Sequence, residues 1–129
     1  MESQPGEAPI RPAERLAAPI IEVELDHELE LLRAGNSYLS TDHAATTILK
    51  RPGIRVVLVA LRAGGRMPEH HQDSPIAVQV LAGHIRFGVE GRSLDLRPGH
   101  LVGLADSLPH QILAVEESAL LLTIGAVLS

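Results

Sequence analysis

Apolar and polar positions alternate along much of the chain, most clearly in the stretch HIRFGVEG (84–91). Ile85, Phe87 and Val89 are separated there by polar or small residues. A period of two is typical of a strand that packs one face against a core and exposes the other. The pattern therefore predicts a strand here and places His84 on its solvent-exposed face.

Similar short apolar segments, bounded by turn residues, fill most of the chain that follows residue 44. Pro52-Gly53 separates the first two segments, which we expect to pair as a hairpin. The predicted strands are residues 45–50, 54–62, 76–82, 84–89, 93–96, 101–104, 111–115 and 118–124. Short strands at this spacing predict an all-β fold, either a small antiparallel sandwich or a barrel.

A helical period precedes the strands, in EVELDHELELLRAGN (22–36). Leucines stand there among acidic residues, and basic Arg33 is followed by a glycine stop; the leucines are Leu25, Leu29, Leu31 and Leu32. This combination predicts a short amphipathic helix in front of the strands.

The chain of 129 residues has room for one ordinary domain. Residues 1–18 are rich in proline, glutamate and alanine, so we expect a flexible arm there and one domain over residues 19–129. The arm lacks the continuous apolar segment of a secretion signal, and the run ALLLTIGAVL (119–128) has about half the length of a membrane-spanning helix. We therefore expect a cytoplasmic protein without membrane contact, and a buried final strand.

Composition narrows the chemistry that the domain can perform. Hydrophobic residues make up 45% of the chain, yet Trp is absent and Tyr and Phe occur once each, so the core must be aliphatic. A formal net charge of -5 without stacking rings argues against nucleic acid as a partner. The absence of cysteine excludes thiolate nucleophiles, disulfides and cysteine-type zinc sites.

Seven histidines remain as candidates for metal or acid-base chemistry, because neutral imidazole is a common metal ligand. Four of them are isolated polar residues, which we expect at the surface: His27, His43, His84 and His100. The other three, His70, His71 and His110, lie beside turns at the ends of predicted strands. Side chains from different strands converge at the rim of a barrel, so these three are the candidate metal ligands.

Glycines accompany these histidines at fixed distances. Gly64 precedes His70 by six positions and Gly83 follows it, while Gly99 precedes His110 by eleven. This spacing resembles the two sequence motifs of the cupin family, over about residues 45–124. The resemblance implies a double-stranded β-helix, also called a cupin or jelly-roll barrel, and a homodimer.

The inner positions of both motifs depart from the family pattern. The family's first motif has His-x-His, then a gap of three or four residues, then a glutamate. If the gap is three, Gln72 stands in place of the second histidine and Ile76 in place of the glutamate. If the gap is four, Glu69 and His71 occupy the His-x-His positions. In the second motif the proline, glycine and asparagine are replaced by Ala105, Ser107 and Ala114. The resemblance therefore carries over the turns and the final histidine, but not the full ligand set.

Adjacent residues of a strand point to opposite faces, so His70 and His71 enter the barrel together only across a bulge. An inward His70 gives the set His70, Gln72 and His110, which is a weak site for a divalent ion. An inward His71 brings Glu69 with it and gives two histidines and one carboxylate, an arrangement that suits iron(II). Glu69 and Gln72 are thus candidate ligand-binding residues, and the alternatives stay open.

Three functions agree with these patterns. In the first, the resemblance implies a metal-dependent cupin, dioxygenase-like or isomerase-like, holding iron, zinc, manganese or nickel. In the second, no metal is bound and the barrel is a small-molecule binding or sensor module, which the apolar Ile76 favours. In the third, the barrel is a structural scaffold for dimerisation. The pattern singles out no catalytic residue, and the substrate cannot be read from aliphatic lining residues.

Overall fold

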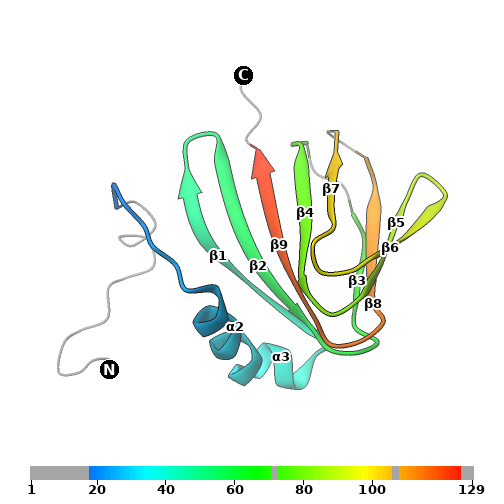
Figure 1. The fold of residues 1–129 in the computed structure, drawn as a ribbon, viewed down its shortest axis with the longest axis horizontal. Helices are drawn as coiled ribbons and strands as arrows, with labels where there is room; N and C mark the ends of the chain where they lie inside the picture. Colours follow the sequence, from blue (N-terminus) through cyan, green and yellow to red (C-terminus); the bar gives the residue numbers. More distant parts are fainter. Residues whose placement is uncertain (1–17, 71–72, 106–107, 126–129) are drawn as a thin grey trace.

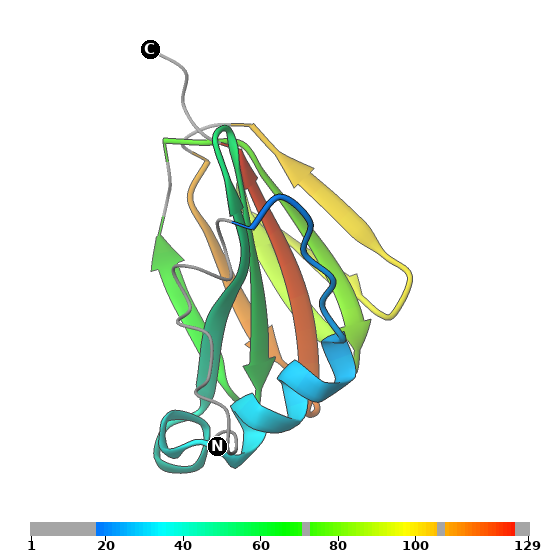
Figure 2. The same cartoon turned by 90° about the vertical axis from the view of Figure 1, so that its left-hand side faces the viewer.

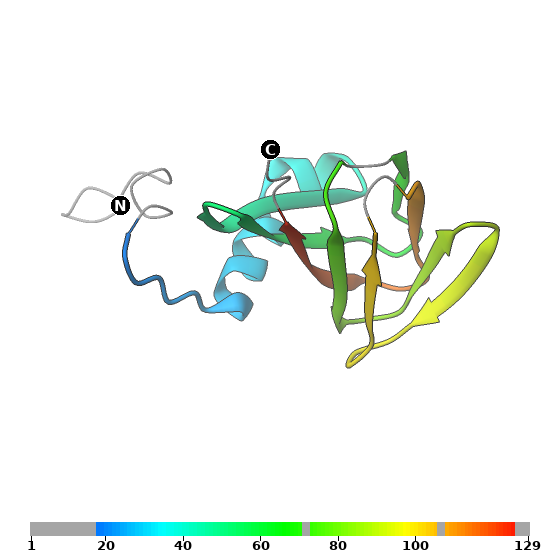
Figure 3. The same ribbon diagram turned by 90° about the horizontal axis from the view of Figure 1, so that it is seen from above.

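The computed structural model describes residues 18–70, 73–105 and 108–125, which form two antiparallel sheets. One sheet has the strand order β1-β2-β9-β4-β7 and the other β3-β8-β5-β6. The strands are β1 (His43–Arg51), β2 (Ile54–Leu61), β3 (Arg66–His70), β4 (Ile76–Ala82), β5 (Ile85–Val89), β6 (Arg92–Leu96), β7 (Leu101–Leu104), β8 (His110–Ala114) and β9 (Ser118–Gly125). Seen from above, the two sheets face each other around a common interior (Figure 3). The predicted all-β barrel is confirmed.

The C-terminal apolar run forms the centre of the larger sheet. β9 pairs with β2 on one side and with β4 on the other, so both of its edges are hydrogen-bonded. Its burial pattern is almost continuous, as a strand between two neighbours in a covered sheet requires. The predicted buried final strand and the hairpin of β1 with β2 are both confirmed.

The core lies between the inner faces of the two sheets and is aliphatic apart from Phe87. Alternate residues of each strand enter it, as the period of two requires. Its buried members are Val57, Val59, Leu61, Ile76, Val78, Val80, Ile85, Phe87, Leu96, Ile112, Ala114, Leu120, Leu122 and Ile124. Each Val, Leu, Ile or Phe side chain among them stabilises the fold by about 1.5–3 kcal/mol relative to an exposed position.

Two helices, α2 (Leu25–Ala34) and α3 (Asn36–Ser40), lie against β1 and β2 at one end of the barrel (Figures 1 and 2). Tyr38 of α3 is buried against Ala44 and Ala60. The Tyr38 hydroxyl donates a 2.8 Å hydrogen bond to Glu117, which ties the helices to the turn between β8 and β9. Burial, and then this hydrogen bond, raise the pKa of Tyr38.

The predicted helix is confirmed and its glycine stop is Gly35, whose N–H bonds to the carbonyl of Leu32. The short helix α3 was not predicted. Neither was β3, because Pro68 and charged neighbours give it little strand character. Proline is tolerated on an edge strand, and β3 is the edge of its sheet.

Residues 1–17 of the predicted arm lie outside the described residues. In the part of the chain that the structure describes, no helix has the length and apolar character needed to cross a membrane.

Candidate metal and ligand site at the barrel rim

His110, one of the predicted ligands, is buried inside the barrel. It begins β8, its side chain faces the barrel interior, and it is 2% exposed. The carbonyl oxygen of Leu108 lies 3.1 Å from Nδ1. Because a carbonyl can only accept, Nδ1 carries the hydrogen, and in the neutral ring Nε2 then carries the lone pair. A histidine held in this tautomer is prepared to bind a metal ion or accept a proton through Nε2.

Phe87, the single phenylalanine, supports the ring of His110. The two rings are stacked with centroids 5.5 Å apart and planes inclined by 15°. Phe87 is fully buried in β5, the strand beside β8. The stack, together with the Leu108 carbonyl, fixes the imidazole on two sides.

Strand pairing brings a second candidate histidine next to His110. β3 and β8 are antiparallel, and His70 is the register partner of His110. The register shifts between Met67 and His70, so β3 has one residue more than β8 over this interval. Such a bulge changes which residues of a strand share a face with the partner strand. Of the adjacent histidines, His70 is the one in register with His110.

The sequence also predicted Glu69, His71 and Gln72 as ligands. His71 and Gln72 lie outside the described residues, and Glu69 is described by its backbone in β3. Ile76, at the glutamate position of the motif, begins β4 and is 5% exposed within the aliphatic core. Within residues 18–70, 73–105 and 108–125, no cluster of three or more His, Asp or Glu side chains could hold a metal ion.

The surface assignment is correct for His27 and His100, which are exposed, and His43 is partly buried against Asp42. For His84 the prediction of a solvent-facing side chain is wrong, because the residue is 8% exposed. Parity does place it on the outer face, but its backbone N–H donates to the Ser118 hydroxyl, at the start of β9, at 3.0 Å. Its ring Nε2 lies 2.9 Å from Asp95 on β6. This contact, and then Arg86, lower the pKa of Asp95.

Ser118, His84 and Asp95 are the residue types of a serine hydrolase, but their geometry differs from a catalytic triad. The Ser118 hydroxyl donates to the carbonyl of Glu116 at 2.7 Å, and its contacts with His84 are to the backbone. A triad requires the hydroxyl to bond the imidazole ring. The cluster therefore fastens the β4–β5 turn to β9 and has no nucleophile.

No protein-family model and no curated protein sequence matches the chain. Solved structures do match. A salicylate 1,2-dioxygenase variant from Pseudoaminobacter salicylatoxidans superposes with a TM-score of 0.76 and 18% identity, over 95% of this chain and 40% of that chain. A cupin superfamily protein from Desulfitobacterium hafniense superposes with a TM-score of 0.68 and 12% identity, over 88% of this chain and 96% of that chain. A DMSP lyase from Ruegeria pomeroyi superposes with a TM-score of 0.64 and 20% identity, over 78% of this chain and 55% of that chain.

The two antiparallel sheets and these superpositions define a double-stranded β-helix. The chain has the fold of the cupin superfamily, as the glycine spacing predicted. At 12–20% identity the likeness establishes the fold, and the chemistry has to come from the residues of the site.

Proposed function

We propose that this protein binds a divalent transition metal at the barrel rim through His110 and His70, and that the ion offers its remaining positions to a small organic molecule. The observation that carries the proposal is the pairing of His70 with a buried His110 whose Nδ1 is already held by the Leu108 carbonyl. Directly opposed residues of an antiparallel pair have Cβ atoms about 4.5–5.5 Å apart. From that separation two imidazoles can reach one ion at about 2.0–2.1 Å.

The donor set makes this site different from a four-ligand cupin. Ile76 offers an apolar side chain at the position of the motif's glutamate, so the protein ligands closest to the ion are neutral. A neutral imidazole set suits zinc, iron or nickel better than magnesium or calcium. Such an ion, when bound, supplies a Lewis acid to a small substrate. The aliphatic residues around the rim favour a substrate with an apolar body.

Elemental analysis of protein purified without an affinity tag tests the proposal. We expect one equivalent of a transition metal per chain in the wild type. In His110→Ala the bound-metal content should fall by at least about tenfold. His100→Ala is the matched control, because His100 is exposed and lies in the turn between β6 and β7. It should retain the metal.

Two further variants separate the alternatives for the second ligand. His70→Ala should lose the metal and His71→Ala should retain it, since His70 is in register with His110. The reverse result would favour the set of Glu69, His71 and His110. Folding of each variant is verified by circular dichroism.

Protein that binds none of iron, zinc, manganese or nickel, either as purified or after addition of the ion, would contradict the proposal. The buried Ile76 favours the second candidate function in that case, which is metal-free binding of an apolar small molecule in the barrel.

A further inference from the structure

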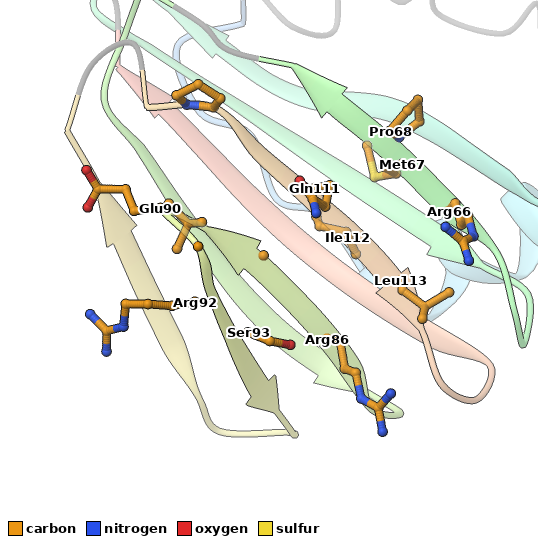
Figure 4. A pocket seen from close by; sticks show the side chains of 14 residues that line it. Arg66, Met67, Pro68, Arg86, Glu90, Arg92, Ser93, Gln111, Ile112 and Leu113 are labelled. Atoms are coloured by element: carbon orange, nitrogen blue, oxygen red, sulfur yellow. The ribbon is translucent and has the colours of Figure 1, made fainter.

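The small sheet carries a groove on its outer face, away from the barrel interior. The groove has a volume of about 820 Å³, and its lining includes Arg66, Arg86, Arg92, Ser93, Gln111 and Leu113. Figure 4 shows these side chains on β3, β8, β5 and β6. We call it the outer groove.

The sheet separates the outer groove from the rim site. Along β8, buried and more exposed residues alternate, so His110 faces the interior while Gln111 and Leu113 face outward. Residue pairing continues this face onto the neighbours: Leu113 is in register with Arg66 on one side and Arg86 on the other. A ligand in the outer groove would therefore not touch His110.

The charge of the outer groove is opposite to that of the whole chain. The chain has 16 acidic and 11 basic residues. The groove has three arginines and a single carboxylate, that of Glu90. Arg86 contacts Asp95 at 3.5 Å. Among the described residues, no carboxylate forms a salt bridge with the guanidinium of Arg66 or Arg92. Arg92 is in register with Val89, which pairs with His110, so its side chain belongs to the other face of the sheet. Arg66 and the exposed Arg86 are the cations that the outer groove offers to an external anion.

The floor of the outer groove between the arginines contains one apolar side chain, Leu113, and one polar side chain, Gln111. Leu113 lies between Arg66 and Arg86 (Figure 4), and neighbouring strands are about 4.8 Å apart. Gln111 lies across Gly88 of β5, where an added Cβ would approach its Nε2 to 2.9 Å. The absence of a side chain at Gly88 thus gives the Gln111 amide its place in the floor. The outer groove therefore combines an apolar surface, an amide group and flanking positive charges.

We propose that the outer groove binds a small organic anion, a carboxylate or phosphate on an apolar body. Arg66 and Arg86, which lie on either side of Leu113 on the outer face, hold the anionic group, because guanidinium groups bind planar carboxylates and phosphates through paired hydrogen bonds. Leu113 packs against the apolar body and Gln111 contributes a polar contact. This site is independent of the metal proposed at the rim.

Titration of ¹⁵N-labelled full-length protein with benzoate and with phenyl phosphate tests the proposal. Benzamide is the neutral control for benzoate, and inorganic phosphate is the control without an apolar body. We expect at least one organic anion to shift the amides of β3, β8, β5 and β6, inorganic phosphate to bind more weakly, and benzamide to cause no shift. The shifts should persist in EDTA and in His110→Gln, which distinguishes them from binding to a rim metal.

Variants identify the groups involved. The double variant Arg66→Gln/Arg86→Gln should bind the same anion about tenfold or more weakly, because each substitution removes a charge-assisted hydrogen bond. Arg97→Gln, at an exposed arginine outside the groove, should bind like the wild type. All these residues are exposed, so folding is retained. The absence of shifts at 10 mM anion, equal affinity in the double variant, or loss of binding in EDTA would each overturn the proposal.

Discussion

At the scale of single residues, His110 is defined by the groups that surround it. The backbone carbonyl of Leu108 selects its tautomer, and the ring of Phe87 lies parallel to it at 5.5 Å. Neither contact can be read from a motif, because both depend on the loop before β8 and on the strand beside it. On a looser support the same histidine would hold the proposed metal ion more weakly.

Phe87 should be among the most sensitive positions for stability. It is fully buried, and Phe87→Ala removes its contacts with the aliphatic core and with His110. We expect the free energy of unfolding, measured by urea denaturation, to fall by about 3–5 kcal/mol. Val115→Ala, at a residue that is 41% exposed, should cost less than about 0.5 kcal/mol. Similar losses in both variants would contradict the packing described for Phe87.

Asp95 should make stability depend on pH in the acid range. Its pKa is lowered in the folded state, first by the hydrogen bond with His84. A lowered carboxyl pKa contributes stability above the unfolded value of about 3.9, and that contribution is lost as the pH falls through the lower, folded value.

The unfolding free energy of the wild type should therefore exceed that of Asp95→Asn above about pH 5, and the difference should shrink below about pH 4. Urea denaturation between pH 3 and 7 measures it. Glu22→Gln, at an exposed residue before α2, should match the wild type throughout. A difference for Asp95→Asn that is constant over this range would rule out the contribution.

At the scale of elements, the turns explain why some motif positions are kept while ligand positions are not. Gly83, between β4 and β5, has φ +88°, and an added Cβ would lie 2.3 Å from the carbonyl oxygen of Glu117. The turn before β9 closes directly over this glycine and over His84. The closing glycine of the first motif is thus required by the fold, independently of any metal.

This requirement can be measured with a pair of glycine variants. Gly53, between β1 and β2, has a similar φ of +90° but no atom within 4 Å of an added Cβ. Gly53→Ala should cost about 1 kcal/mol, for the backbone conformation alone. Gly83→Ala should cost at least about 2 kcal/mol more, because the turn must move. Equal costs in thermal or urea unfolding would show that the close approach at Gly83 is relieved without strain.

At the scale of the whole molecule, the barrel presents two surfaces of different character. The rim and the outer groove lie on opposite faces of the small sheet, as the alternation along β8 requires. On the larger sheet, the edge strand β7 carries Leu101, which is 66% exposed. An apolar side chain on an open sheet edge favours association with another chain.

We propose that the protein is a homodimer, as the resemblance to cupins implies. Sedimentation equilibrium at micromolar concentration should give about twice the chain mass of 13.8 kDa. The value should not depend on salt, since apolar surface is not screened. A mass of 13.8 kDa at all concentrations would contradict the proposal.

The sequence by itself determined the architecture, because turn glycines and a period of two are local signals. It predicted eight of the strands and the helix from such signals, and it identified His110 from its distance to Gly99. It missed β3, whose Pro68 and charged residues form a strand only because β8 pairs with it.

Only the tertiary structure decided which of two adjacent histidines is in register with His110, and that His84 is covered. A bulge of one residue between Met67 and His70 changes the parity of β3, and parity decides which face a residue occupies. The backbone N–H of the buried His84 bonds to Ser118, 34 positions away, and its ring contacts Asp95 on another strand. Both outcomes depend on contacts between distant segments, which a local pattern does not contain.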